Sequence, residues 1–107
     1  MKIDLRVPPC KPANETADFI KQCEDAGFDG VGLLDSQLLE RDVFVSMAVA
    51  VQATSKIRIA SAVINPVTRH VSVLASAIKT VAEMAPGRTE FCIGRGYSSV
   101  QTIGIKP

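Results

Sequence analysis

Four short polar or glycine-containing segments carry the side chains of this sequence that could take part in chemistry. They are residues 8–11, 35–37, 63–70 and 94–99. Each follows an apolar run of about the length of a β-strand. In parallel α/β folds, functional residues gather at the carboxyl ends of the strands. We therefore expect these segments to meet at one edge of a sheet and to form the site of the protein.

Three side chains in these segments each allow a functional and a structural interpretation. Asp35 could accept hydrogen bonds from a cofactor ring, although acids at strand ends more often cap turns. His70, the single histidine, could act as a general acid or base. No nucleophile or carboxylate lies near it in the sequence, which favours a structural role. Arg69 could bind an anionic substrate group or pair with a surface acid, and the sequence leaves both open.

The segment from Gly94 to Ser99 partly matches the phosphate-binding motif G-x-G-x-x-G. Ser99 stands where the third glycine belongs, and the chain ends before the acidic residue expected about 20 positions later. A small dinucleotide-binding domain is therefore disfavoured. Glycine at positions 94 and 96 still indicates a backbone that turns sharply or that a flat ligand approaches closely.

The elements that must position these segments alternate between strand and helix. Apolar runs at residues 3–7, 30–34, 57–63 and 90–93 predict four strands. They begin near residues 3, 30, 57 and 89, which are 27, 27 and 32 residues apart. This spacing is typical of βα units with right-handed crossovers, and it predicts a parallel sheet.

Three main helices are predicted between the strands. The first is capped by Asn14 and buries a stripe of Phe19, Ile20, Cys23 and Ala26. The second, residues 43–53, follows Asp42 as its cap and is apolar almost all round. The third begins at residue 71 and has the clearest helical period, and residues 98–103 could form a short fourth helix. Such units fit either a small open α/β domain or the first half of an eight-stranded barrel of about 250 residues.

Composition excludes several classes of function. The net charge is +1, there is no tryptophan, and no basic stripe is present, so nucleic-acid binding has little support. We see neither an export signal nor a membrane span. One histidine and three widely spaced cysteines predict no metal site. The odd number of cysteines indicates buried or inert thiols in a reducing cytoplasm.

Six segments of the chain resemble, in order and at consistent spacing, the luciferase-like monooxygenases. The resemblance is closest to the deazaflavin-dependent branch related to methylene-tetrahydromethanopterin reductase. The resemblance implies an α/β fold, the N-terminal half of a TIM-type (β/α)8 barrel with about four parallel strands and three main helices. Residues 1–107 would then form one partial barrel domain. The segments are 27–31, 35–43, 53–58, 64–70, 86–88 and 94–107.

The resemblance also implies a cofactor site. The cofactor would be coenzyme F420, a deazaflavin, or FMN, with its ring across the carboxyl ends of the strands. Asp35 would lie near the polar edge of the ring, and a bulge at Ala62-Val63, often with a cis peptide, would support one face. Asn65 would make a polar contact, and Gly94 and Gly96 would let a loop pass close by. Substrate-side positions would be Arg69, His70 and Tyr97.

The implied activity is that of an oxidoreductase that transfers a hydride to, or activates oxygen for, a small organic substrate. Neither the substrate nor the catalytic residues follow from the sequence. Tyr97 stands where the family commonly has an acid, and Val71 where it often has proline. The resemblance also implies a homodimer formed through the second and third helices. The alternative is a truncated, non-catalytic half-barrel or partner-binding module.

Overall fold

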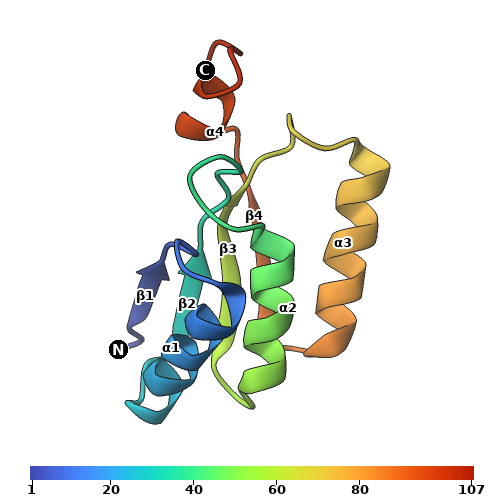
Figure 1. Ribbon diagram of the computed structural model, residues 1–107. Helices are drawn as coiled ribbons and strands as arrows, with labels where there is room; N and C mark the ends of the chain where they lie inside the picture. The colour runs from blue at the N-terminus through green and yellow to red at the C-terminus, as the bar shows by residue number, and fades with distance from the viewer.

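The computed structural model describes residues 1–107 and contains one parallel sheet of four strands (Figure 1). The strands lie in the order β1-β2-β3-β4, so each pairs with its neighbour in the sequence. The parallel sheet is as predicted, and the order differs from that of an open doubly wound sheet, in which β3 or β4 would lie on the other side of β1. The strands are β1 (Asp4–Val7), β2 (Gly30–Leu33), β3 (Arg58–Ile64) and β4 (Thr89–Ile93).

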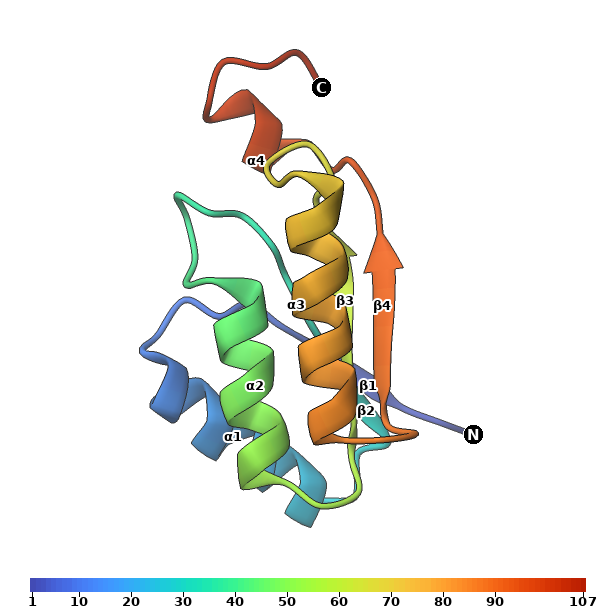
Figure 2. The same cartoon turned by 90° about the vertical axis from the view of Figure 1, so that its right-hand side faces the viewer.

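Three helices cover the same face of this sheet, as Figure 2 shows. They are α1 (Ala13–Asp25), α2 (Val43–Ala53) and α3 (Val71–Met84). Right-handed crossovers that all step in one direction place every helix on one side. A short fourth helix, α4 (Ser98–Gln101), lies beyond the carboxyl ends of the strands. The other face of the sheet carries no helix, as expected for part of a barrel wall.

Two of the three main helices begin as local sequence predicts. The Asp42 carboxylate accepts a hydrogen bond from the Val45 backbone N–H at 2.9 Å and caps α2. The prediction that Asn14 caps α1 was wrong, because the helix already begins at Ala13 and Pro12 is the capping residue. Proline fixes a backbone angle that is compatible with the entry into a helix, and no side chain caps this start.

The buried stripe of α1 agrees with the prediction in part. Ile20 and Cys23 are buried as predicted, whereas Ala26 is exposed and Phe19 is 47% exposed. The stripe that faces the core runs through Thr16, Ile20 and Cys23, with spacings of four and three residues. Phe19 lies to one side of that line, because each residue turns the helix by about 100°.

Alternation along the strands separates the core from the open face. The side chains of Val7, Leu33, Ile59 and Ile64 are buried beneath the helices. Their neighbours in the strands point to the opposite face, among them Arg6. Helix α2 packs against both α1 and α3. The core therefore holds the strands as a platform for the loops at their carboxyl ends.

Polar contacts at the opposite end of the sheet fix where β3 begins. The Glu24 carboxylate accepts backbone hydrogen bonds from Ser55, Lys56 and Ile57, at 3.0, 2.8 and 2.9 Å. The Arg88 guanidinium donates to the carbonyls of the same turn, including that of Ile57 at 3.0 Å. One buried carboxylate and one guanidinium therefore hold the turn between α2 and β3.

No helix is long and apolar enough to cross a membrane. All three thiols are free, and only Cys23 is buried. Cys10 and Cys92 are exposed, so of the two alternatives expected for the thiols, buried or inert, burial applies only to Cys23.

Candidate functional site

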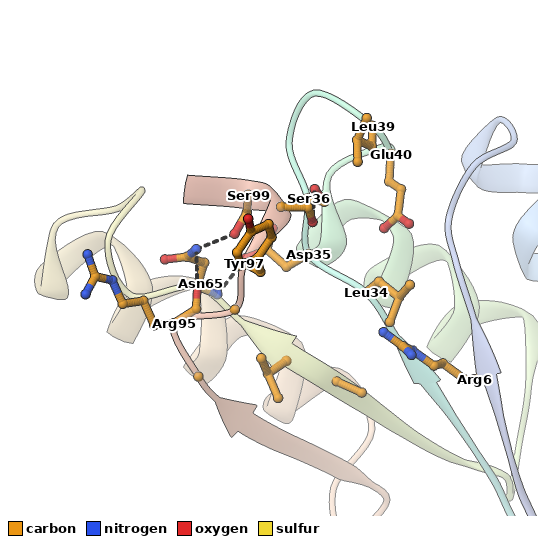
Figure 3. Close-up of a pocket in the computed structure, with 15 residues that line it drawn as sticks. Arg6, Leu34, Asp35, Ser36, Leu39, Glu40, Asn65, Arg95, Tyr97 and Ser99 are labelled. Carbon is orange, nitrogen blue, oxygen red and sulfur yellow. Dashed lines mark hydrogen bonds between the residues drawn. The ribbon is translucent and has the colours of Figure 1, made fainter. Parts of the chain in front are cut away.

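A cavity of about 300 Å³ lies at the carboxyl ends of the strands, where the polar segments were expected to meet (Figure 3). Its walls come from β1, from β3 and from the loops after β2 and β4. Seven of the nine predicted site residues line it, whereas Arg69 and His70 do not. The seven are Asp35, Ala62, Val63, Asn65, Gly94, Gly96 and Tyr97.

The strand end at Ala62 and Val63 has the predicted backbone. The peptide bond between them is cis, and the pairing of β3 with β4 shifts between Ala62 and Ile64. Gly94 on the neighbouring strand end packs directly against this bulge. A Cβ atom at Gly94 would lie 2.9 Å from Cγ2 of Val63, so a larger residue at this position would force Val63 to shift. Glycine at position 94 is thus favoured by its contact with Val63, whatever the cavity binds.

Asp35 is buried and fully engaged by the protein. Its side chain is 3% exposed. Arg69 donates to both carboxylate oxygens, at 2.7 and 3.2 Å, and the Asn65 backbone N–H donates to Oδ2 at 2.9 Å. A carboxylate with these partners is neutralised and held in place. Asp35 therefore fixes the loop after β3 against the loop after β2.

Arg69 forms the other half of this buried pair. Its hydrogen bond to Asp35 raises the pKa of the guanidinium, and the Asp42 carboxylate lies 3.5 Å away. The guanidinium carbon also lies 5.0 Å from the centre of the Phe44 ring, within cation–π range. Arg69 thus ties the β3–α3 loop to the start of α2, and these contacts leave it no place in the cavity lining.

His70 has a structural position of its own. Its side chain is exposed, and Nδ1 accepts a hydrogen bond from the Ser72 backbone N–H at 3.2 Å. The same nitrogen lies 2.8 Å from the Ser72 hydroxyl. His70 therefore caps the first turn of α3, in line with the structural interpretation of the sequence.

Asn65 joins two of the loops that line the cavity. The side chain is 1% exposed. Its amide group donates to the Arg95 carbonyl at 2.8 Å and to the Ser99 hydroxyl, while its oxygen accepts from the Val67 backbone N–H at 2.7 Å. Gln37 also donates to the Ser99 carbonyl, at 2.7 Å. The walls of the cavity are therefore bound to one another before any ligand arrives.

Two charged lining residues were missed by the sequence analysis. Arg6 projects from β1, and its guanidinium forms no ion pair or hydrogen bond with the protein. The Oε2 atom of Glu40 is buried without a hydrogen-bond partner. Burial raises the pKa of this carboxyl, Arg6 lowers it, and Asp35 raises it further. Period-two alternation in β1 could have placed Arg6 on the open face, but nothing in the polar loop singles out Glu40.

No group of three or more histidine, cysteine, aspartate or glutamate side chains is arranged to hold a metal ion. The polar atoms of the cavity are instead single donors and acceptors spread around a partly apolar wall. Such a lining suits a flat organic molecule, for which shape and a few polar contacts determine orientation.

Comparisons with known proteins identify the family of this chain. Residues 3–105 match the sequence profile of the luciferase-like monooxygenase family. The 5,10-methylenetetrahydromethanopterin reductase of Methanolobus tindarius is 31% identical over 106 residues, which are 98% of this chain and 32% of that protein.

Solved structures show the same fold. The coenzyme F420-dependent tetrahydromethanopterin reductase of Methanopyrus kandleri superposes with a TM-score of 0.87 at 27% identity, over 96% of this chain and 30% of that one. The FMN-bound oxygenating constituent of 3,6-diketocamphane monooxygenase from Pseudomonas putida gives 0.76 at 23% identity, over 99% and 33%. The chain thus spans about a third of the length of the proteins it matches, and its fold is part of a (β/α)8 barrel.

Proposed function

Because this chain belongs to the luciferase-like monooxygenase family, we propose that it is the N-terminal, ring-binding portion of an oxidoreductase that uses a reduced flavin-type cofactor. The substrate would be a small organic molecule. Coenzyme F420 and FMN are both candidates. F420 has the stronger support, because the neighbour whose name includes it shares more of the sequence than the FMN-bound neighbour.

The observation that supports this proposal most is the cavity at the carboxyl ends of the strands. Its volume, about 300 Å³, is at the lower limit of small-molecule sites. Ala62 and Val63 offer an apolar surface at the bulge, and Gly94 and Gly96 present no side chain that would block a flat ring. The unpaired Arg6 faces the same space and suits an electron-rich ring edge. The residues present therefore fit the ring part of the cofactor.

Each part of the chain would have a distinct task in this site. The bound cofactor would supply the redox chemistry, either hydride transfer or reaction with oxygen. Ala62 and Val63 would support one face of the ring. Asp35 and Asn65 would act indirectly, by holding the loops that shape the cavity and exclude water. Preorganisation of this kind reduces the ordering that binding would otherwise require.

A comparison of two ligands tests the proposal on the purified chain. Riboflavin and FMN share a ring and differ by a phosphate, for which the cavity shows no cluster of cations. We expect both to bind with similar, weak affinity. Charge-assisted phosphate contacts contribute about 1.5–3 kcal/mol each, so their absence weakens binding by orders of magnitude. NMR shift changes should be confined to Arg6, to the bulge at Ala62 and Val63, and to the loops after β2, β3 and β4.

Three outcomes would contradict the proposal. FMN that binds more than about tenfold better than riboflavin would place phosphate contacts within this chain. Submicromolar binding of FMN or F420 would show that these residues form a complete site. Shift changes far from the cavity, or none at millimolar ligand with the chain folded by circular dichroism, would remove the ring-binding role.

We also propose that α2 and α3 form an interface with a second copy of the chain. Helix α2 is apolar on most sides, yet Val45 remains 57% exposed. On α3, Val71 and Val73 are 71% and 56% exposed. Exposed apolar side chains on neighbouring helices are typical of surfaces that another protein covers. Phe19 is also exposed, but it belongs to α1 and not to the proposed interface, so it serves as a control position.

A further inference from the structure

Glu40 is the one carboxyl group in the cavity that the protein leaves without a full set of partners. Its Oε2 atom is buried and makes no hydrogen bond. Figure 3 shows the carboxyl group above Leu34, on the same side of the cavity as Arg6. An ionised carboxylate oxygen in such a position is costly, because it has lost water and has gained no donor. A neutral carboxylic acid in the same place is far less costly.

The charges around Glu40 come from three parts of the chain. Arg6 faces it from β1 and favours the ionised form, whereas Asp35 from the loop after β2 opposes it. Asp35 is itself neutralised by Arg69. The adjacent Arg41 turns away and donates to the Cys10 carbonyl at 2.6 Å. Burial acts in the same direction as Asp35, and together they outweigh Arg6, so the pKa of Glu40 is raised.

The other cation of the lining, Arg95, does not add its charge to that of Arg6 in the cavity. Arg95 extends away from the cavity in Figure 3, and its guanidinium donates to the carbonyl of Lys106. Arg6 is therefore the unpaired charge of the cavity, and Glu40 is the neighbouring acid with an unused hydrogen-bonding position. The guanidinium N–H groups and the O–H of a protonated carboxyl group both donate hydrogen bonds. Both favour an acceptor that carries negative charge.

We propose that Arg6 and Glu40 together form an anion-binding position in the cavity, in which Glu40 takes up a proton from solvent as the anion binds and donates a hydrogen bond to it. The ligand group would be an anionic oxygen or nitrogen on a planar molecule, such as a carboxylate of the substrate or a deprotonated ring edge. The proposal concerns the cavity of the proposed function and deepens it by assigning the charge of the bound group. Its test uses no flavin, so the two can fail separately.

The experiment measures the pKa of the Glu40 carboxyl by NMR in the complete 107-residue chain, with benzoate as a planar anionic probe. Without a ligand, the pKa should lie above the value of about 4.3 for an unstructured glutamate. Arg6→Gln should raise it further, because a cation that favours ionisation is removed. Millimolar benzoate should raise it in the wild-type chain, since an anion that accepts the proton of Glu40 binds the protonated form better.

Each tenfold preference of benzoate for the protonated form raises the pKa of Glu40 by up to one unit at saturation. Arg6→Gln should abolish this rise. Arg41→Gln removes a neighbouring cation that does not line the cavity, and it should leave the rise unchanged. Glu40→Gln keeps a neutral donor, so its benzoate affinity should not weaken as the pH rises.

A pKa of Glu40 at or below the ordinary value would overturn the proposal, as would a pKa that benzoate lowers or leaves unchanged. If Arg6→Gln does not fold, the measurements on the wild-type chain and on Glu40→Gln still test the proposal. A benzoate affinity that weakens with rising pH to the same extent in the wild-type chain and in Glu40→Gln would overturn the proposal, because a group other than Glu40 would then control binding.

Discussion

Replacing Glu24 by glutamine should remove a large part of the stability of this chain. Glu24 lies near the end of α1, and its side chain is 2% exposed. Burial alone would raise the pKa of this carboxyl. Backbone hydrogen bonds from Ile57, Lys56 and Ser55, with the Lys21 ammonium at 3.2 Å, lower it from 4.5 to about 2. The folded state therefore prefers the ionised form.

The magnitude follows from this shift. Glu24 has a lower pKa in the folded chain than in the unfolded chain, so its contribution is complete above pH 4.5 and is lost as the pH falls towards 2. At 1.36 kcal/mol per pKa unit, the carboxylate contributes about 3 kcal/mol at neutral pH. About half of this should remain at pH ~3.

Glutamine keeps one acceptor oxygen, so we expect Glu24→Gln to cost about 2–3 kcal/mol at pH ~7. The thermal midpoint of a chain of this size should then fall by about 10–20 °C. Urea unfolding of the wild type, Glu24→Gln and the exposed control Glu83→Gln at both pH values measures the effect. The gap between wild type and Glu24→Gln should narrow at the lower pH. A loss within about 0.5 kcal/mol of the control, or a gap that does not change with pH, would refute this account.

Two further variants test the site platform and the proposed interface. Arg69→Met leaves the Asp35 carboxylate buried without its cation, so the free energy of unfolding should fall by about 3–5 kcal/mol in urea titrations; a loss below about 1 kcal/mol would mean that the pair is not structural. Val73→Lys places a charge on the exposed apolar surface of α3 and should weaken self-association in sedimentation equilibrium by about tenfold or more. Phe19→Lys on α1 should have no such effect, and equal effects of both variants would contradict an interface at α2 and α3.

Much of the candidate site could be predicted from the sequence. Strands of parallel sheets end at the same edge, so the loops after residues 33, 64 and 93 had to lie together. The Ala62-Val63 bulge came from the resemblance and is present. The contacts of individual side chains could not be predicted in the same way. Asp35 and Asn65 were expected to contact a ligand, yet their polar atoms are engaged by other residues of the chain.

The amino-acid sequence by itself was enough to predict the four strands, their parallel arrangement, the three main helices and the family. These follow from apolar periodicity, from turn residues and from the handedness of βα connections, which act over neighbouring residues or hold for all such folds. The tertiary structure decided which charges meet. Arg69 and Asp35 are 34 residues apart in the chain, and Glu24 reaches a turn 31–33 residues away. No local pattern encodes such distances, so only the packed chain shows that Arg69 is paired and that Arg6 and Glu40 are not.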